Sequence, residues 1–288
     1  MEMYLYDEEI KKLKMKHDDL IKDFKSMGIV LTIMTVSIFI VLLFLNYRLE
    51  NTDYIMFEML FVFIISTIDV VIMVLHCERK KRAFYYDEVN QVVINVLRGE
   101  SNLEIINKKS HKEYLSELRE TRVQDGDFIS LYNAFDFKND DINGTIYNVI
   151  FSRSNGKASY ETLRGLVLRF KATTSLNVQV RNDMFAPFKL KKDKEETEKP
   201  MRVYLPKKEE GKFSEIAINC FNILKEKFDA QSVGVDIRPG EVVFYINFGK
   251  NMVKIKSFDQ KNIEKYCNMF VNSINVATEL KEKIEGEF

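Results

Sequence analysis

Two long apolar stretches, residues 27–45 and 55–77, dominate the pattern of the N-terminal part of the chain. The first carries no charged side chain, and as a helix rising about 1.5 Å per residue it crosses roughly 30 Å of hydrocarbon. A helix on the surface of a globular protein needs a polar face, which this stretch lacks. The connecting residues 46–54 are too few to fold alone. The pattern therefore predicts a transmembrane helical hairpin.

Two acids, Glu58 and Asp69, interrupt the second stretch. A carboxylate at mid-span costs about 3 kcal/mol, but each surrounding Ile, Leu, Val or Phe contributes about −0.3 to −0.6 kcal/mol, so insertion remains favoured. Asp69 then has two interpretations. Together with Glu58, which lies on nearly the same helix face, it is part of an ion or proton path or of a partner contact. Alternatively, it is protonated or hydrogen-bonded to a hydroxyl of the first span (Thr32, Thr35 or Ser37). We favour the second, because two spans alone cannot enclose a path.

Basic residues flank the hairpin on one side only. Lys22 and Lys25 precede the first span, and the connecting loop holds only Arg48. Four basic residues follow the second span: Arg79, Lys80, Lys81 and Arg82. The positive-inside rule therefore predicts a cell-membrane protein with both termini in the cytoplasm. The same cluster is also suited to contacts with anionic lipid head groups.

Residues 1–26 and 78–125 are predicted to be cytoplasmic helices that extend the hairpin. Apolar or ring side chains recur at spacings of three and four before the first span: Tyr6, Ile10, Leu13, His17, Leu20, Phe24 and Met27. A helical pattern follows the second span over residues 84–97, and Ser110 with Glu113 forms the signature of a capping box. We expect the two extensions to pack as an antiparallel coiled pair.

Residues 126–288 are predicted to form an α+β domain. Alternating strands are expected at residues 145–152, 163–171 and 176–181, with hairpin turns at Asn143-Gly144 and Asn155-Gly156. Residues 189–200 lack an apolar pattern and are expected to be a flexible loop. Further strands are expected at 201–205, 233–237, 242–248 and 252–257, with helices at 213–228 and 260–283. The expected architecture is an antiparallel sheet with helices on one side.

Three short motifs carry a family resemblance: an acidic-Asn-Gly segment at residues 140–146, an Arg-Gly-apolar strand at 163–168 and a hairpin strand at 240–246. In these motifs and their order, the chain resembles the bacterial two-pass membrane proteins that share the domain of unknown function numbered 3137. The resemblance covers roughly residues 79–257. It implies a membrane location and a fold, and it supplies no reaction.

The amino-acid composition argues against several classes of function. The 43 basic and 43 acidic residues balance, which argues against a nucleic-acid partner. The three cysteines (Cys77, Cys220 and Cys267) are widely spaced, as expected of reduced thiols, and the three histidines lack metal-site spacing. We therefore predict no catalytic residue, cofactor or metal.

The sequence leaves three functions open. The first is an interaction or scaffold module that binds a protein partner or a second copy of the chain. The second is a membrane-tethered enzyme with a carboxylate site, and the third is a subunit of a channel or transport assembly that uses Asp69. A polar cleft with convergent carboxylates would favour the enzyme, and an exposed apolar patch on the sheet would favour a protein partner.

Overall fold

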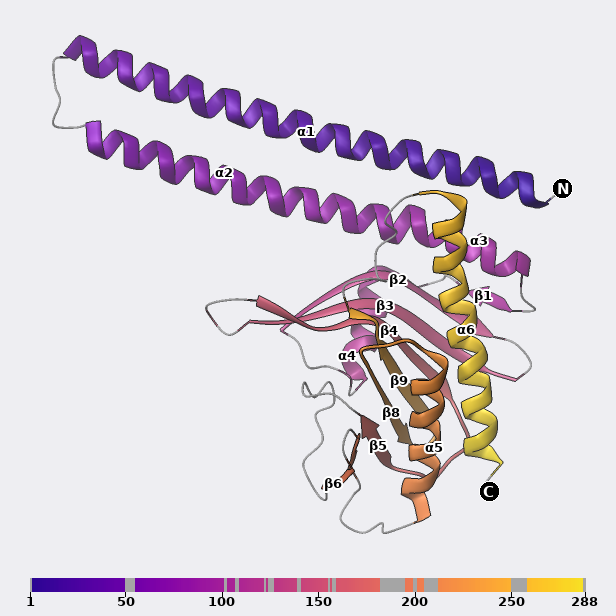
Figure 1. Ribbon diagram of the computed structural model, residues 1–288. Helices are drawn as coiled ribbons and strands as arrows, with labels where there is room; N and C mark the ends of the chain where they lie inside the picture. The colour runs from indigo at the N-terminus through magenta and orange to yellow at the C-terminus, as the bar shows by residue number, and fades with distance from the viewer. Residues whose placement is uncertain are drawn as a thin grey trace. The chain divides into compact units, whose positions relative to one another are not determined.

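The computed structural model describes residues 2–49, 55–100, 103–106, 109–121, 123, 127–138, 141–154, 156, 159–181, 195–198, 201–204, 212–249 and 258–286. The chain separates into two compact units (Figure 1). One, called here the helical unit, is Lys11–Phe84. The other, the sheet unit, comprises Tyr85–Phe288 together with Met1–Ile10.

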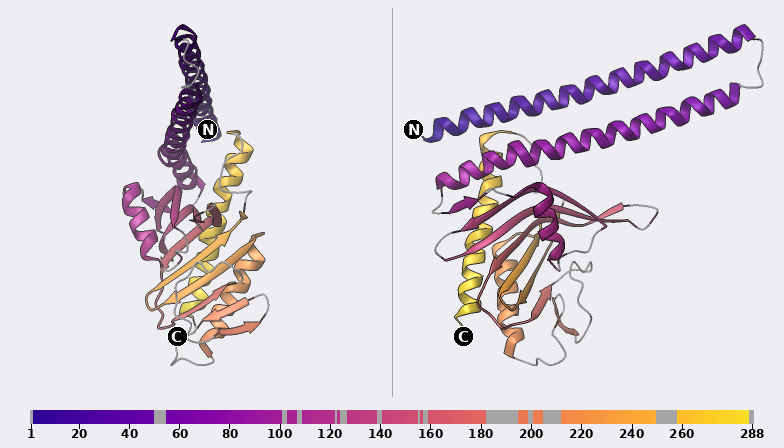
Figure 2. Two further views of the ribbon diagram at one scale, coloured as in Figure 1. Left: turned by 90° about the vertical axis from the view of Figure 1, so that its left-hand side faces the viewer. Right: turned by 180° about the vertical axis from the view of Figure 1, so that it is seen from behind.

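The helical unit consists of α2 (Ile55–Phe84) and of α1 (Glu2–Leu49) from Lys11 onward, which lie side by side in Figures 1 and 2. The less exposed positions of each helix recur every third or fourth residue. They are Leu20, Phe24, Met27, Gly28, Leu31, Thr35, Phe39 and Leu42 in α1 and Val62, Ile65, Ser66, Asp69, Met73, Cys77 and Glu78 in α2. This spacing is typical of two helices that pack along a seam. A ring contact between His17 and Phe84, with centroids 5.8 Å apart, joins the helices beyond the apolar stretches.

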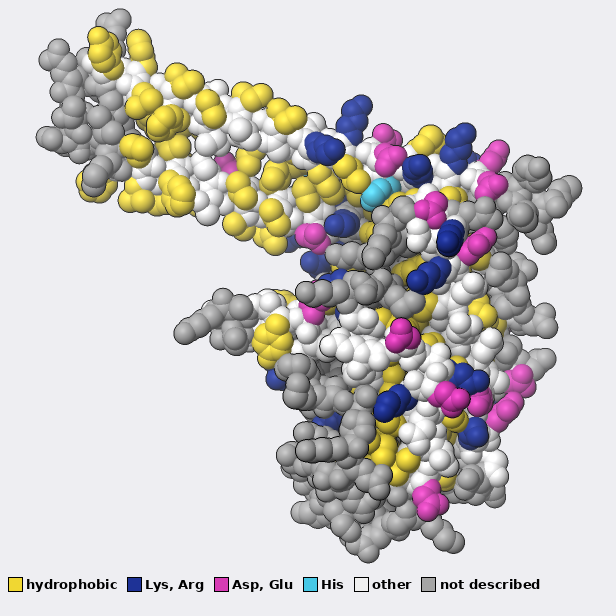
Figure 3. Space-filling model, in the orientation of Figure 1, with side chains coloured by type: hydrophobic (Ala, Val, Ile, Leu, Met, Phe, Trp, Pro, Cys, Tyr) yellow, Lys and Arg dark blue, Asp and Glu magenta, His cyan; other side chains and the backbone are white. Residues whose placement is uncertain are grey.

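Away from this seam, the apolar side chains of the helical unit are uncovered. None of the most apolar 18-residue window of α1 and only 6% of that of α2 is buried. Ile29 is 62% exposed and Phe63 is 70% exposed. Figure 3 shows hydrophobic side chains over much of the visible surface of both helices. Two helices of this protein are thus long and apolar enough to cross a membrane.

The described strands of the sheet unit form one antiparallel sheet in the order β1-β2-β3-β4-β9-β8-β5-β7-β6. Their bounds are β1 Glu104–Ile106, β2 Phe128–Lys138, β3 Asn143–Ser154, β4 Ser159–Lys171, β5 Val178–Arg181, β6 Glu195–Glu198, β7 Met201–Tyr204, β8 Ser232–Arg238 and β9 Glu241–Asn247. The predicted α+β class and the antiparallel sheet are confirmed. The prediction of a flexible loop over residues 189–200 is wrong in part, because β6 lies within it and pairs with β7.

Helices cover both faces of the sheet, so the prediction of helices on one side is wrong. The helices are α3 (Asn90–Glu100), α4 (His111–Glu120), α5 (Lys212–Lys227) and α6 (Gln260–Glu285). Tyr114 of α4 belongs to a buried cluster with Tyr147 of β3, whereas Phe270 of α6 packs on Phe135 of β2. Figure 1 shows α5 and α6 in front of the sheet, and the rear view of Figure 2 shows α4 in front of it. The predicted capping box opens α4, with Ser110 and Glu113 in reciprocal hydrogen bonds.

A one-turn π-helix, η1 (Tyr85–Val89), connects α2 to α3 and interrupts the regular helix predicted there. A π turn changes which carbonyls are bonded within the helix. The side chain of Asn133 donates to the Tyr85 carbonyl at 3.5 Å, and that of Asn90 donates to the Ala134 carbonyl at 3.2 Å. Asn133 lies at a bulge of β2, and Tyr266 of α6 donates to its side-chain oxygen. Buried polar side chains therefore join η1, the bulged strand and α6.

The Asn143-Gly144 dipeptide is not a turn, because both residues lie within β3. Gly144 is required by packing instead: a Cβ atom there would lie 2.9 Å from the Phe137 ring and 2.5 Å from the Arg169 carbonyl oxygen. The second predicted turn agrees with the structure, since Gly156 has a φ of 82° between β3 and β4. The strand predicted at 252–257 lies outside the described residues.

Gly165 gives a direct test of the sheet register. A Cβ atom at this position would lie 1.8 Å from the Ile246 carbonyl oxygen on β9. Gly165→Ala should therefore force the β4–β9 pair apart and destabilise the protein by about 1–3 kcal/mol, measured as a lower Tm by circular dichroism. Ser116→Ala, at an exposed position of α4, is the control. Equal melting temperatures for the two variants would contradict the pairing.

Candidate functional site

Polar side chains line up across the face of the sheet that carries α4. Asp136, Thr145 and Arg169 are cross-strand neighbours on β2, β3 and β4. They lie two residues from Ala134, Tyr147 and Val167 of the buried cluster packed on α4, and alternate residues of a strand share a face. The face therefore changes from apolar to charged along the strands.

A cavity of about 560 Å³ opens over these charged residues, and we call it the polar cavity. Its charged lining comes from α4, from the segment before it and from the three strands β2, β4 and β9: Lys109, Glu117, Asp136, Arg169, Lys171 and Glu241. A second cavity of about 570 Å³, the adjoining cavity, shares Asn143, Lys171 and Gly240 with it. Both volumes are typical of small-molecule sites.

Lys109 is the centre of one half of the polar cavity. Its Nζ lies 2.8 Å from Glu117 Oε1 and 3.1 Å from Asp136 Oδ2. Thr145 donates to Asp136 at 2.7 Å, and the Tyr147 hydroxyl donates to Glu117 at 3.3 Å. Burial alone would lower the pKa of Lys109, but its hydrogen bonds to the two carboxylates outweigh burial and raise the pKa. The ammonium is therefore held charged between two acids.

Glu241 is the centre of the other half. It accepts a hydrogen bond from Arg169 Nε, and Arg238 Nη1 lies 3.5 Å away. Arg238 Nε in turn donates to the fully buried Asp236 at 2.9 Å. Burial opposes the charge of Arg169, but the Glu241 carboxylate outweighs it and raises the pKa of the guanidinium. Ion pairs thus extend from β4 to β8.

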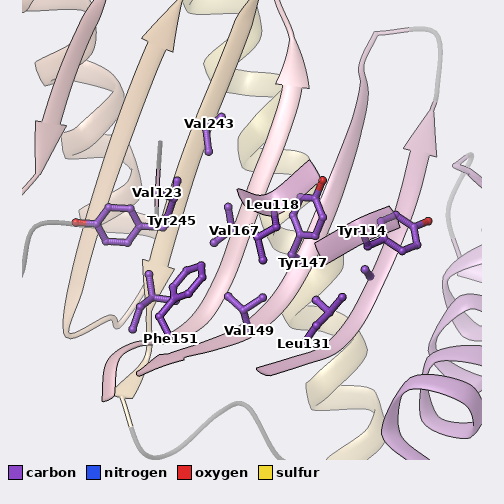
Figure 4. Close-up of a cluster of buried hydrophobic side chains, with 12 residues drawn as sticks. Tyr114, Leu118, Val123, Leu131, Tyr147, Val149, Phe151, Val167, Val243 and Tyr245 are labelled. Atoms are coloured by element: carbon purple, nitrogen blue, oxygen red, sulfur yellow. The ribbon is translucent and has the colours of Figure 1, made fainter. Parts of the chain in front are cut away.

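The tyrosines beside the cavity remain neutral. Tyr147 and Tyr114 meet edge to face with ring centroids 6.1 Å apart, as Figure 4 shows within the apolar cluster. Burial raises the pKa of both hydroxyls, and the charge of Glu117 adds to the effect at Tyr147. The neutral Tyr147 hydroxyl can donate to Glu117. The apolar cluster that holds Tyr147 therefore also positions one hydrogen bond of the polar cavity.

This arrangement suits recognition of a polar group more than proton transfer. Glu117, Asp136 and Glu241 each already face a cation. Within the ranges that the structure describes, no group of three or more His, Cys, Asp or Glu side chains could hold a metal ion. None of these residues can be recognised as part of a site from a local motif, because they are far apart along the chain. One feature of the sequence does point to the site: Arg169 is a charged residue at a position of the predicted strand 163–171 whose preceding alternate neighbours are apolar.

The predicted intramembrane acid Asp69 lies in the seam of the helical unit and is partly covered. In the described part of the chain it has no hydrogen bond to Thr32, Thr35 or Ser37, and Thr32 donates to the Gly28 carbonyl of its own helix at 2.9 Å. The role of Asp69 therefore remains a prediction. Glu58 lies within α2, but its side chain is outside the described set.

The basic cluster lies at the end of α2. Arg79, Lys80 and Arg82 are exposed, and Lys81 is half-buried with its Nζ 3.9 Å from Glu78. These side chains belong to the helical unit, whereas the polar cavity belongs to the sheet unit. Their proposed contact with lipid head groups remains a prediction.

Comparison with protein-family models, with curated proteins and with solved structures finds no match to this chain. The features of this protein that bear on its function are therefore its apolar helices and its polar cavity.

Replacing Lys109 tests the ion pairs of the cavity. Lys109→Met leaves Glu117 and Asp136 together without their cation, so the variant should be less stable by about 1–3 kcal/mol. Because folding raises the pKa of Lys109 above 10.5, its contribution is complete below pH 10.5 and disappears as the pH rises through the folded-state pKa.

The measurement is the Tm of the wild type and of Lys109→Met between pH 7 and pH 11.5, with Lys112→Met on the exposed side of α4 as the control. The gap between wild type and Lys109→Met should be constant to about pH 10 and then close. A gap no larger than that of the control would show that these ion pairs add no stability.

Proposed function

We propose that this chain is a two-span membrane protein that presents its α+β sheet unit to the cytoplasm as an interaction module. The observation that carries the membrane part is the apolar surface of α1 and α2, of whose most apolar windows 0% and 6% are buried. Soluble monomers rarely leave such an extended apolar surface in water. A bilayer would cover it without any further protein.

The seam supports the same proposal. Two polar side chains within the apolar run of α2, Ser66 and Asp69, lie among its less exposed positions, whereas the exposed Thr67 donates to the Phe63 carbonyl of its own helix at 2.8 Å. Ser66 donates to the Val62 carbonyl of its own helix at 2.7 Å, which satisfies its hydroxyl hydrogen inside hydrocarbon. The exposed surface of the two helices is then mostly apolar, as insertion of two spans requires.

The distribution of basic residues supports the orientation. Lys22 and Lys25 of α1 and the cluster at Arg79–Arg82 of α2 flank the same end of the two apolar stretches. Short segments rich in Lys and Arg stay in the cytoplasm during insertion. The sheet unit follows the cluster in the chain, so we place it in the cytoplasm.

The polar cavity supports an interaction role for the sheet unit. Among the described residues of this unit, Phe128 is the one large hydrophobic side chain that is exposed, at 60%. An apolar docking patch on the sheet is thus not found in the described part. We therefore propose that the unit engages a polar partner through the polar cavity.

Protease protection tests the membrane arrangement. The full chain should resist alkaline extraction from membranes, and protease should remove the sheet unit in inside-out vesicles but not in intact spheroplasts. Replacing Arg79, Lys80, Lys81 and Arg82 with Gln should yield a mixed population, because the orientation signal is weakened.

A matched control replaces four exposed lysines of the sheet unit with Gln: Lys225, Lys227, Lys261 and Lys265. This variant should keep the wild-type protection pattern. Release of the wild type by alkali, or digestion from the outer face, would overturn the proposal.

A further inference from the structure

Three polar side chains line up where the polar cavity meets the adjoining cavity. Lys138 ends β2, Asn143 begins β3, and Lys171 ends β4. Lys138 pairs with Asn143 in the register, and the Gly144–Phe170 pair places Lys171 on the other side of Asn143. All three are exposed and share the face of Asp136 and Arg169. With strands about 4.8 Å apart, the two lysines are separated by about 10 Å at the backbone.

The carboxylates that line the two cavities already have partners. Glu117 and Asp136 face Lys109, and Glu241 faces Arg169. At the far end of the adjoining cavity, Glu285 accepts from the Thr173 amide at 2.6 Å and lies 3.6 Å from Lys281.

Asp141 also lines the adjoining cavity, where its backbone carbonyl accepts from Lys281. The side chains of Lys138 and Lys171, in contrast, have no hydrogen bond or ion pair within the described ranges, although Glu104 and Glu241 lie opposite them in the strand register. Two ammonium groups at this junction are therefore left without a partner among the described residues.

The junction has both the space and the donors for an anion. Asn143, Lys171 and Gly240 line both cavities, so open volume lies on either side of the row. Two ammonium groups and one amide offer several N–H donors from neighbouring strands. The long lysine side chains can converge on one group across about 10 Å. An anion with several oxygen acceptors fits such a set better than a monovalent carboxylate, because it can accept from all three side chains.

We propose that Lys138, Asn143 and Lys171 bind a small anion of the phosphate class at the junction of the two cavities. This site goes beyond the membrane arrangement and does not depend on it. A soluble phosphate compound and a phospholipid head group share this chemistry, and the experiment distinguishes them.

The test uses the full chain purified in a neutral detergent and titrated calorimetrically, in separate arms, with inorganic pyrophosphate and with dioctanoyl phosphatidic acid. The expected result is saturable binding of at least one probe that weakens as salt rises. The Lys138→Gln, Lys171→Gln double variant should bind at least about tenfold more weakly, because two charge-assisted contacts are lost.

Two further variants serve as controls for charge and for folding. Lys225→Gln, Lys265→Gln removes the same charge from exposed positions of α5 and α6 and should bind like the wild type. Asn143→Ala should weaken binding without changing the charge, which guards against loss of folding in the double variant. Binding of pyrophosphate supports a soluble ligand, and binding of the lipid alone supports a head group. The absence of saturable binding, or equal losses in the control and the double variant, would overturn the proposal.

Discussion

The constraint on which this structure depends is the uncovered apolar surface of α1 and α2. The seam accounts for the covered positions, such as Leu31 and Met73, while Ile29 and Phe63 remain exposed. Every buried CH₂ group is worth about 0.8 kcal/mol, so a surface of this kind needs an apolar environment. We propose that a bilayer supplies it and that the basic cluster after α2 determines the side on which the sheet unit lies.

Within the sheet unit, polar groups are kept in two separate places. On the α6 face, the amides of Asn133 and Asn148 meet the hydroxyl of Tyr266 in a fully buried network. On the α4 face, the charges of Lys109 and Glu241 line an open cavity. The first network is closed off from solvent and joins η1 to the sheet through the hydrogen bond from Asn133 to the Tyr85 carbonyl. The second leaves unpaired lysines at its rim, which is why we assign binding to it.

The sequence was sufficient wherever one local pattern determined the structure. The apolar stretches, the capping box at Ser110 and the turn at Gly156 all follow from neighbouring residues. It was not sufficient where distant segments meet. The role of Gly144 depends on Phe137 and Arg169, which no local pattern reveals, so the dipeptide was assigned to a turn. The cavity charges were missed for the same reason, since only the strand order brings them together.

The central claim, that lipid covers the outer surface of the helical unit, is tested most directly by spin-label scanning in bilayers. Single labels at exposed positions such as Ile29 and Ile33 are compared with labels at the seam positions Leu31 and Thr35. The account predicts that oxygen reaches the exposed positions readily, that a water-soluble nickel chelate does not, and that neither reaches the seam. Chelate access at Ile29 or Ile33 equal to that at the exposed Lys225 would contradict it.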